Sequence, residues 1–138
     1  MNFVISMIPI TNTELAVLTH GGHPIARDGS DNWMADAQAQ RAFAGQPLVE
    51  HSYAPKAMPA ICAALGIPQV GGLPENKAIC LSAHELAAAC SRYQMAQLQS
   101  DSERVYSAFF MDQCAHTVCA ALVHWCPHVY ITIDRIEG

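Results

Sequence analysis

The sequence predicts an α/β (or α+β) fold, built as one compact sandwich of four to five strands with helices. Apolar, β-favouring runs at 2–8 and 128–136 predict strands near the two ends of the sequence. Helix-capping signals between these runs mix helices with the strands, as in a layered α/β structure. The chain has 138 residues and shows no internal repeat, low-complexity segment or linker, so we expect a single domain over 1–138.

The first half of the chain mixes strands, helices and loops. Residues 2–8 have the near-continuous apolar pattern of a strand buried on both faces. A capping box formed by Thr11 and Glu14 indicates a short helix after it, although a second strand of a hairpin fits the same segment. The segments that follow, in chain order, are the short helix over 15–20, a loop over 21–32, a helix over 33–45, a strand over 47–53 and a helix over 59–66 that ends at Gly66.

Two capping boxes give the strongest helix predictions in the second half of the chain. They are Ser82–Glu85, which opens a helix through about Leu98, and Ser100–Glu103, which opens a helix through about His124. A buried strand over 77–81 precedes the first of these helices. Pro127 stops the second helix, and the alternation of apolar and polar residues over 128–136 predicts a strand covered on one face. The C-terminal part therefore reads as a long buried helix followed by a half-buried strand.

The charge content limits the kinds of partner. Charged residues make up 14% of the chain, against roughly 25% in an average soluble domain. Either an Ala-rich domain needs few charges, or another chain covers part of the surface, as in an oligomer or a complex. The net charge is −5 with neutral histidines, and no two of the seven Lys and Arg residues are adjacent. Because phosphate binding needs clustered cations, we expect no nucleic-acid partner.

The apolar and cysteine patterns indicate a cytoplasmic protein with no membrane partner. No apolar run approaches the roughly 20 residues that a membrane helix needs. Segment 1–10 carries no Lys or Arg and no small-residue cleavage pattern, so we interpret it as a strand and not as a signal peptide. The six cysteines contain no C-x-x-C spacing, and most stand in Ala-rich or aliphatic segments. We therefore expect free thiols in a reducing compartment.

The stretch Cys114–Val129 concentrates three cysteines and three histidines. On a helical wheel the helix that enters it is apolar on most sides, with Gln113 and Thr117 on a small polar face, so we expect it to be largely enclosed. Asp112 and His116 lie four residues apart on an apolar stripe, where their side chains can meet. Three interpretations stay open: a satisfied Asp–His pair, for example at a subunit contact; an Asp-oriented histidine acting as a base or ligand; or an exposed stripe without a role.

Two other groups in this half of the chain are candidates for chemistry. His124, Cys126 and His128 stand at a helix-to-strand corner, and thiolate and imidazole groups are ligands of zinc. Because the corner lacks the paired spacing of zinc modules, we expect no cofactor and keep zinc as the alternative. Cys80 just precedes a helix N-terminus, where a thiol can become nucleophilic, so it joins Asp112 and His116 as a catalytic candidate.

A loop near the N-terminal end is the first choice for a small-ligand site. It brings histidine, arginine and aspartate together beside two glycines, which let a backbone approach a ligand closely. The candidate residues are His20, His23, Arg27, Asp28 and Asp31. The alternative is a helix cap followed by a turn.

These observations favour a binding protein over an enzyme. The sequence contains no G-x-S-x-G, Walker or dinucleotide-binding glycine pattern. We therefore expect a small acidic cytoplasmic protein that acts by protein–protein association, either as an inhibitor- or immunity-like protein with a protein partner or as a homo-oligomer. The alternative is a small His/Cys-dependent enzyme or metal-binding domain with its ligand site in the His20–Asp31 loop.

Overall fold

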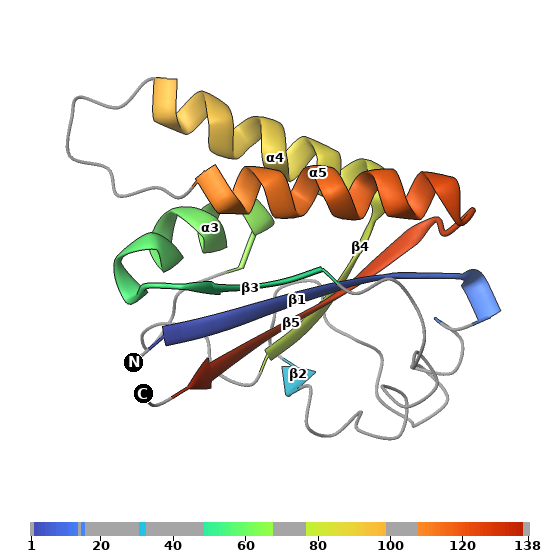
Figure 1. Cartoon of the computed structure of the whole chain (residues 1–138), viewed down its shortest axis with the longest axis horizontal. Helices are drawn as coiled ribbons and strands as arrows, with labels where there is room; N and C mark the ends of the chain where they lie inside the picture. The colour runs from blue at the N-terminus through green and yellow to red at the C-terminus, as the bar shows by residue number, and fades with distance from the viewer. Residues whose placement is uncertain are drawn as a thin grey trace.

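One antiparallel sheet with helices on one face makes up the described part of the chain in this computed structural model, residues 2–13, 15, 31–32, 49–67, 77–98 and 108–136 (Figure 1). The strands are β1 (Asn2–Ile10), β2 (Asp31–Asn32), β3 (Val49–Tyr53), β4 (Lys77–Ser82) and β5 (His128–Ile136). The helical elements are the 3-10 turn η2 (Pro55–Ala57) and the helices α3 (Met58–Leu65), α4 (Ala83–Leu98) and α5 (Ala108–Val123). The mixed architecture with a C-terminal helix and strand confirms the predicted fold class.

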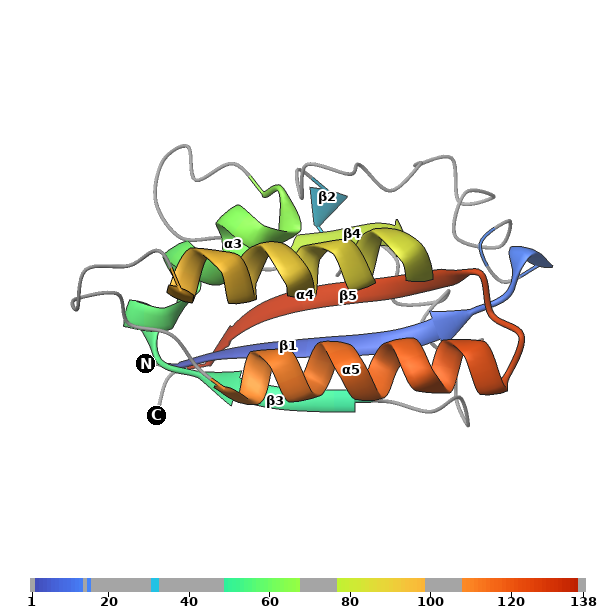
Figure 2. The same ribbon diagram turned by 90° about the horizontal axis from the view of Figure 1, so that it is seen from above.

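The sheet has the strand order β2-β4-β5-β1-β3, so the first and last strands of the chain are neighbours at its centre. β1 pairs with β5 along its whole length, and Ile5 and Met7 stand opposite Ile133 and Ile131. All four of these side chains are buried. From above, α4 lies between α3 and α5, and α5 runs over β1 and β3 (Figure 2). The helices therefore bury the sheet face that carries these four side chains.

β1 is buried more on one face than on the other, which differs from the predicted double burial. Phe3, Ile5 and Met7 are buried, whereas Val4, Ser6 and Ile8 between them are only half-buried. Successive side chains of a strand point to opposite faces of the sheet. The alternation of buried and half-buried residues therefore shows that the helices cover one face of β1.

The capping signals at Ser82 and Gly66 place two helix ends correctly, whereas Ser100–Glu103 and Glu14 lie outside the described residues. Ser82 Oγ accepts from the Glu85 backbone N–H at 2.9 Å, and Glu85 accepts from the Ser82 backbone N–H at 3.1 Å, which is the predicted reciprocal capping box. At the C-terminal end of α3, Gly66 adopts a left-handed conformation with φ 76°. The Gly66 and Ile67 N–H groups then donate to the carbonyls of Ala63 and Cys62, as in a Schellman motif.

α5 is enclosed along one face only, and the polar residues Gln113 and Thr117 lie on that buried face. The expectation of a largely enclosed helix is therefore wrong, because α5 exposes the face opposite Gln113 and Thr117. Gln113 is 2% exposed and Thr117 is fully buried, whereas Asp112 and His116 are exposed. The reason is that both buried groups find hydrogen-bond partners, so their burial leaves no unsatisfied polar atom.

The side-chain amide of Gln113 ties α5 to two strands of the sheet. Its Nε2 donates to the Ile5 carbonyl at 2.7 Å and to the Val49 carbonyl at 2.9 Å, so it bridges β1 and β3. Its Oε1 accepts from the Tyr53 hydroxyl at 2.6 Å. One turn further on, the Thr117 hydroxyl donates to the Gln113 carbonyl at 2.7 Å. Both donors and the acceptor of this buried amide are used, which fixes the rotation of α5 over the sheet.

Replacing Gln113 by Leu removes these bonds with little change in volume. We expect Gln113→Leu to lower the free energy of unfolding by about 3 kcal/mol, because the Tyr53 hydroxyl and two strand carbonyls lose a buried partner. Urea denaturation followed by circular dichroism measures this. Gln94→Leu, the same change at an exposed position of α4, is the matched control and is expected to stay within about 0.5 kcal/mol of the wild type. Equal stability of the two variants would contradict this role of Gln113.

Candidate functional site

Most of the predicted ligand loop lies outside the described residues. His20, His23, Arg27 and Asp28 are not among them, and Asp31 is placed only as the first residue of β2, opposite Ala78 of β4. A small-ligand site in this loop therefore stays a prediction.

The helix-to-strand corner does not bring its three candidate metal ligands together. Cys126 is buried and its thiol donates to the His124 carbonyl at 3.5 Å, while the His124 side chain is exposed. The His128 ring is 2.8 Å from Asn12 Oδ1, at the end of β1. Within the described ranges, no group of three His, Cys, Asp or Glu side chains could hold a metal ion. The geometry gives the zinc alternative no support.

Cys80 stands on the sheet face turned away from the helices. Its strand neighbours Ile79 and Leu81 are buried in the core, and Cys80 itself is opposite Tyr130 of β5 and half-buried. Because strand side chains alternate between faces, the thiol does not share a face with the start of α4. The arrangement therefore lacks the helix N-terminus that would activate a nucleophilic thiol.

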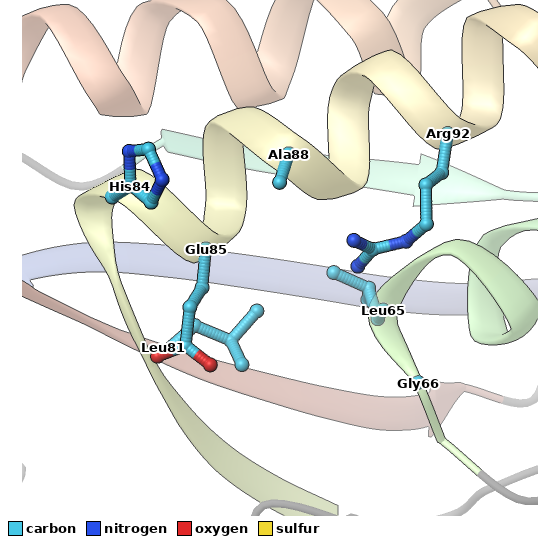
Figure 3. A pocket seen from close by; sticks show the side chains of 7 residues that line it. All are labelled: Leu65, Gly66, Leu81, His84, Glu85, Ala88 and Arg92. Carbon is cyan, nitrogen blue, oxygen red and sulfur yellow. The ribbon is translucent and has the colours of Figure 1, made fainter.

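A pocket of about 310 Å³ opens between α3, β4 and α4 (Figure 3). Its lining residues are Leu65, Gly66, Leu81, His84, Glu85, Ala88 and Arg92. Glu85 and Arg92 extend from the same side of α4, with Ala88 between them (Figure 3). The Arg92 guanidinium donates to the Ala64 carbonyl from Nη2 at 2.7 Å and from Nε at 3.2 Å, and Glu85 caps α4. Both charged groups thus stabilise helix ends.

The outward-facing side of α5 carries an unusual set of exposed side chains, which we call the α5 outer face. Its members are Ala108, Phe109, Asp112, Ala115, His116, Cys119, Leu122 and Val123. Three of them are large apolar residues with exposed fractions of 60% for Phe109, 69% for Leu122 and 71% for Val123. The inner edge of Phe109 rests on His51 of β3, with ring centroids 4.4 Å apart. Apolar side chains thus mark both ends of the face.

Asp112 and His116 lie in the middle of the α5 outer face, and both are exposed. No hydrogen bond or ion pair joins either side chain to the described part of the chain. The structure therefore does not show the satisfied Asp–His pair that was one interpretation of the sequence. Because the stripe is open to solvent, it carries no cost of a buried charge.

Trp125, directly after α5, is the most exposed large apolar residue in the described part of the chain. Its side chain is 89% exposed, and its backbone is left-handed, with φ 56°. The Trp125 and Cys126 N–H groups donate to the carbonyls of Leu122 and Ala121. This is the same Schellman motif that ends α3, where glycine occupies the left-handed position. A side chain there costs roughly 1–2 kcal/mol relative to glycine, so α5 ends with a strained residue that packs little against the fold.

The cysteines are free thiols with contrasting surroundings. Burial raises the pKa of the Cys62 thiol to about 12. Burial also raises the pKa of Cys90 on α4 and of Cys114 on the neighbouring helix α5. Cys119, by contrast, is exposed on the α5 outer face. The buried thiols therefore behave as small apolar core residues.

Comparison with family models, with curated proteins and with solved structures finds no match to this chain. Function is therefore inferred from the residues themselves. Reasoning from the sequence found the apolar stripe of Asp112 and His116 and left its exposure open, but it did not single out Trp125. The signal for the orientation of α5 is the spacing of Gln113 and Thr117, which lie four residues apart on one side of the helix. Two polar side chains on one side can form hydrogen bonds with a sheet beneath the helix as well as with solvent.

The raised pKa of Cys62 predicts a loss of stability at alkaline pH. An exposed thiol in the unfolded chain ionises near pH 9, whereas the folded-state pKa is about 12. The unfolded state therefore releases this proton first, and the free energy of unfolding falls as pH rises from about 9 towards 12. Urea denaturation in steps above pH 8, under reducing conditions, measures the slope.

The free energy of unfolding of Cys62→Ala is expected to fall less steeply over this pH range, whatever its value at pH 8. Cys119→Ala, a change at an exposed cysteine, is expected to keep the wild-type slope. If Cys62→Ala follows the wild-type slope as well, another group controls the alkaline decline.

Proposed function

We propose that this protein acts by binding another protein chain through the α5 outer face and Trp125, and not by catalysis. The observation that carries the proposal is Trp125, an aromatic side chain that is 89% exposed at a strained helix end. Tryptophan is among the residues that most often dominate protein–protein binding energy, because one buried indole supplies a large contact area.

The amount of exposed apolar surface supports this proposal. Phe109, Leu122, Val123 and Trp125 are each at least 60% exposed. Together they present on the order of 500 Å² of apolar surface, divided between the two ends of the helix. Their charged neighbours on the helix are few, since Asp112 is the sole acidic residue of the α5 outer face.

The strain at Trp125 supports the proposal independently. At the end of α3, Gly66 occupies the same position of the motif, and a Cβ there would meet nothing within 4 Å. Glycine therefore suits this position because of its left-handed backbone and not because space is short. The tryptophan in the equivalent place is 89% exposed and packs little against the described part of the chain. Strained residues of this kind are typical of functional sites, where a contact made outside the fold offsets their cost.

The remaining observations favour association over chemistry. Within the described residues, the candidate catalytic groups Cys80, Asp112 and His116 are not brought together. The net charge of −5 suits solubility or a basic partner surface. We also propose a cytoplasmic location, which the six cysteines without disulfides support. The described residues include no helix long and apolar enough to cross a membrane.

Trp125→Gly tests the proposal because it separates binding from folding. We expect the variant to be as stable as the wild type or up to about 1 kcal/mol more stable, since relief of the left-handed strain outweighs the added freedom of the unfolded chain. Binding, measured as self-association by sedimentation and as retention of proteins on the immobilised chain, is expected to be lost.

Ile136→Ser is the control, since Ile136 is 40% exposed at the end of β5 and alternates with the buried Ile133, so it lies on the sheet face turned away from α5. It is expected to retain every association of the wild type. A Trp125→Gly protein that is clearly less stable, or that binds like the control, would overturn the proposal.

A further inference from the structure

We infer that the chain that covers the α5 outer face is a second copy of this protein, with the two α5 helices packed antiparallel about a two-fold axis beside Ala115 and His116. This inference rests on the proposed function and names its partner. A two-fold interface uses the same patch on both copies, so each exposed residue must meet a suitable residue of the same set.

The positions of the exposed residues meet this requirement. When α5 is reversed about the point between Ala115 and His116, the α5 outer face maps onto itself. The resulting opposite pairs are Ala108 with Val123, Phe109 with Leu122, Asp112 with Cys119, and Ala115 with His116. No buried residue of α5 falls opposite an exposed one in this register.

The chemistry of the pairs fits the same arrangement. Phe109 of one copy meets Leu122 and Val123 of the other at each end of the helix pair, so every large apolar residue of the face faces another. A parallel pair would instead place Phe109 against Phe109 and leave the two ends unequal. The small side chains of Ala115 and Cys119 near the centre allow the helix axes to approach closely.

The centre of the face gives hydrogen-bond complementarity. In this register the second copy's His116 faces Ala115. Asp112 lies three residues before Ala115, a distance of about 4.5 Å along the helix axis. An imidazole N–H of His116 can therefore donate to the carboxylate of Asp112 across the axis, twice by symmetry. Neither side chain has a hydrogen-bond partner within the described part of its own chain, so the contact needs no internal bond to break.

The area agrees with what a dimer requires. Two copies of the exposed apolar set bury on the order of 1,000 Å² in total, which is at the lower limit for a specific interface. This total includes Trp125, which stands directly after the end of α5. We therefore expect a dimer that dissociates on dilution.

Single cysteines test both the dimer and its orientation. In a Cys119→Ser background, Ala108→Cys and Val123→Cys place thiols at positions that the antiparallel register brings together. Mixing the two variants under mild oxidation is expected to give a mixed disulfide, identified by mass spectrometry. Each variant alone is expected to give little disulfide-linked dimer. In a dimer of one variant, the two introduced cysteines lie about 22 Å apart along the helix axis. His84→Cys in the same background, at an exposed position of α4, controls for random collision.

Sedimentation of the unmodified protein gives the second readout, from about 1 to about 300 μM, where a small interface dissociates. We expect a monomer–dimer equilibrium whose dissociation constant rises at least tenfold in Val123→Asp and is unchanged in Ile136→Ser. Homodisulfides from Ala108→Cys alone would overturn the antiparallel arrangement. A protein that stays monomeric at all concentrations would overturn the inference that the partner is a second copy. The proposed function would still stand if the immobilised wild type retained a different protein and the Trp125→Gly variant did not.

Discussion

The side-chain amide of Gln113 is the interaction on which the position of α5 depends. It donates to carbonyls of β1 and β3 and accepts from Tyr53, so it binds three points of the layer beneath the helix. A helix held at such a point cannot rotate without leaving buried polar groups unsatisfied. The opposite side of the helix, from Phe109 to Val123, must then face outward. The apolar surface of the molecule is thus a consequence of a polar contact in its interior.

Local signals in the sequence predicted the elements well and their orientation less well. The capping box at Ser82 and Glu85 and the helix end at Gly66 are short-range features, determined by residues that touch each other along the chain. The orientation of α5 is a long-range property. The helical wheel placed Gln113 on a small polar face, whereas its partners Ile5, Val49 and Tyr53 come from distant strands that no helical wheel contains.

The candidate site shows the same limit. Cysteines and histidines attracted attention in the sequence because their chemistry is distinctive, yet Cys114 and Cys126 are buried and His124 and His116 are simply exposed. Trp125 carried no motif, and its importance comes from its backbone conformation and its exposure, which are visible only in three dimensions. Before folding, nothing separates a tryptophan that fills a core from one that remains outside it.

The strand order has a consequence for how the chain reaches its folded state. β5 is the last element in sequence, yet it fills the place between β4 and β1. During synthesis the pairs β2–β4 and β1–β3 cannot be joined into one sheet until β5 emerges. Until then β4 and β1 each keep an unpaired edge. Contacts between such distant segments slow folding and leave the nascent chain exposed to aggregation. A ribosome-bound intermediate of this protein would therefore present unpaired strand edges of β4 and β1 until its central strand has been made.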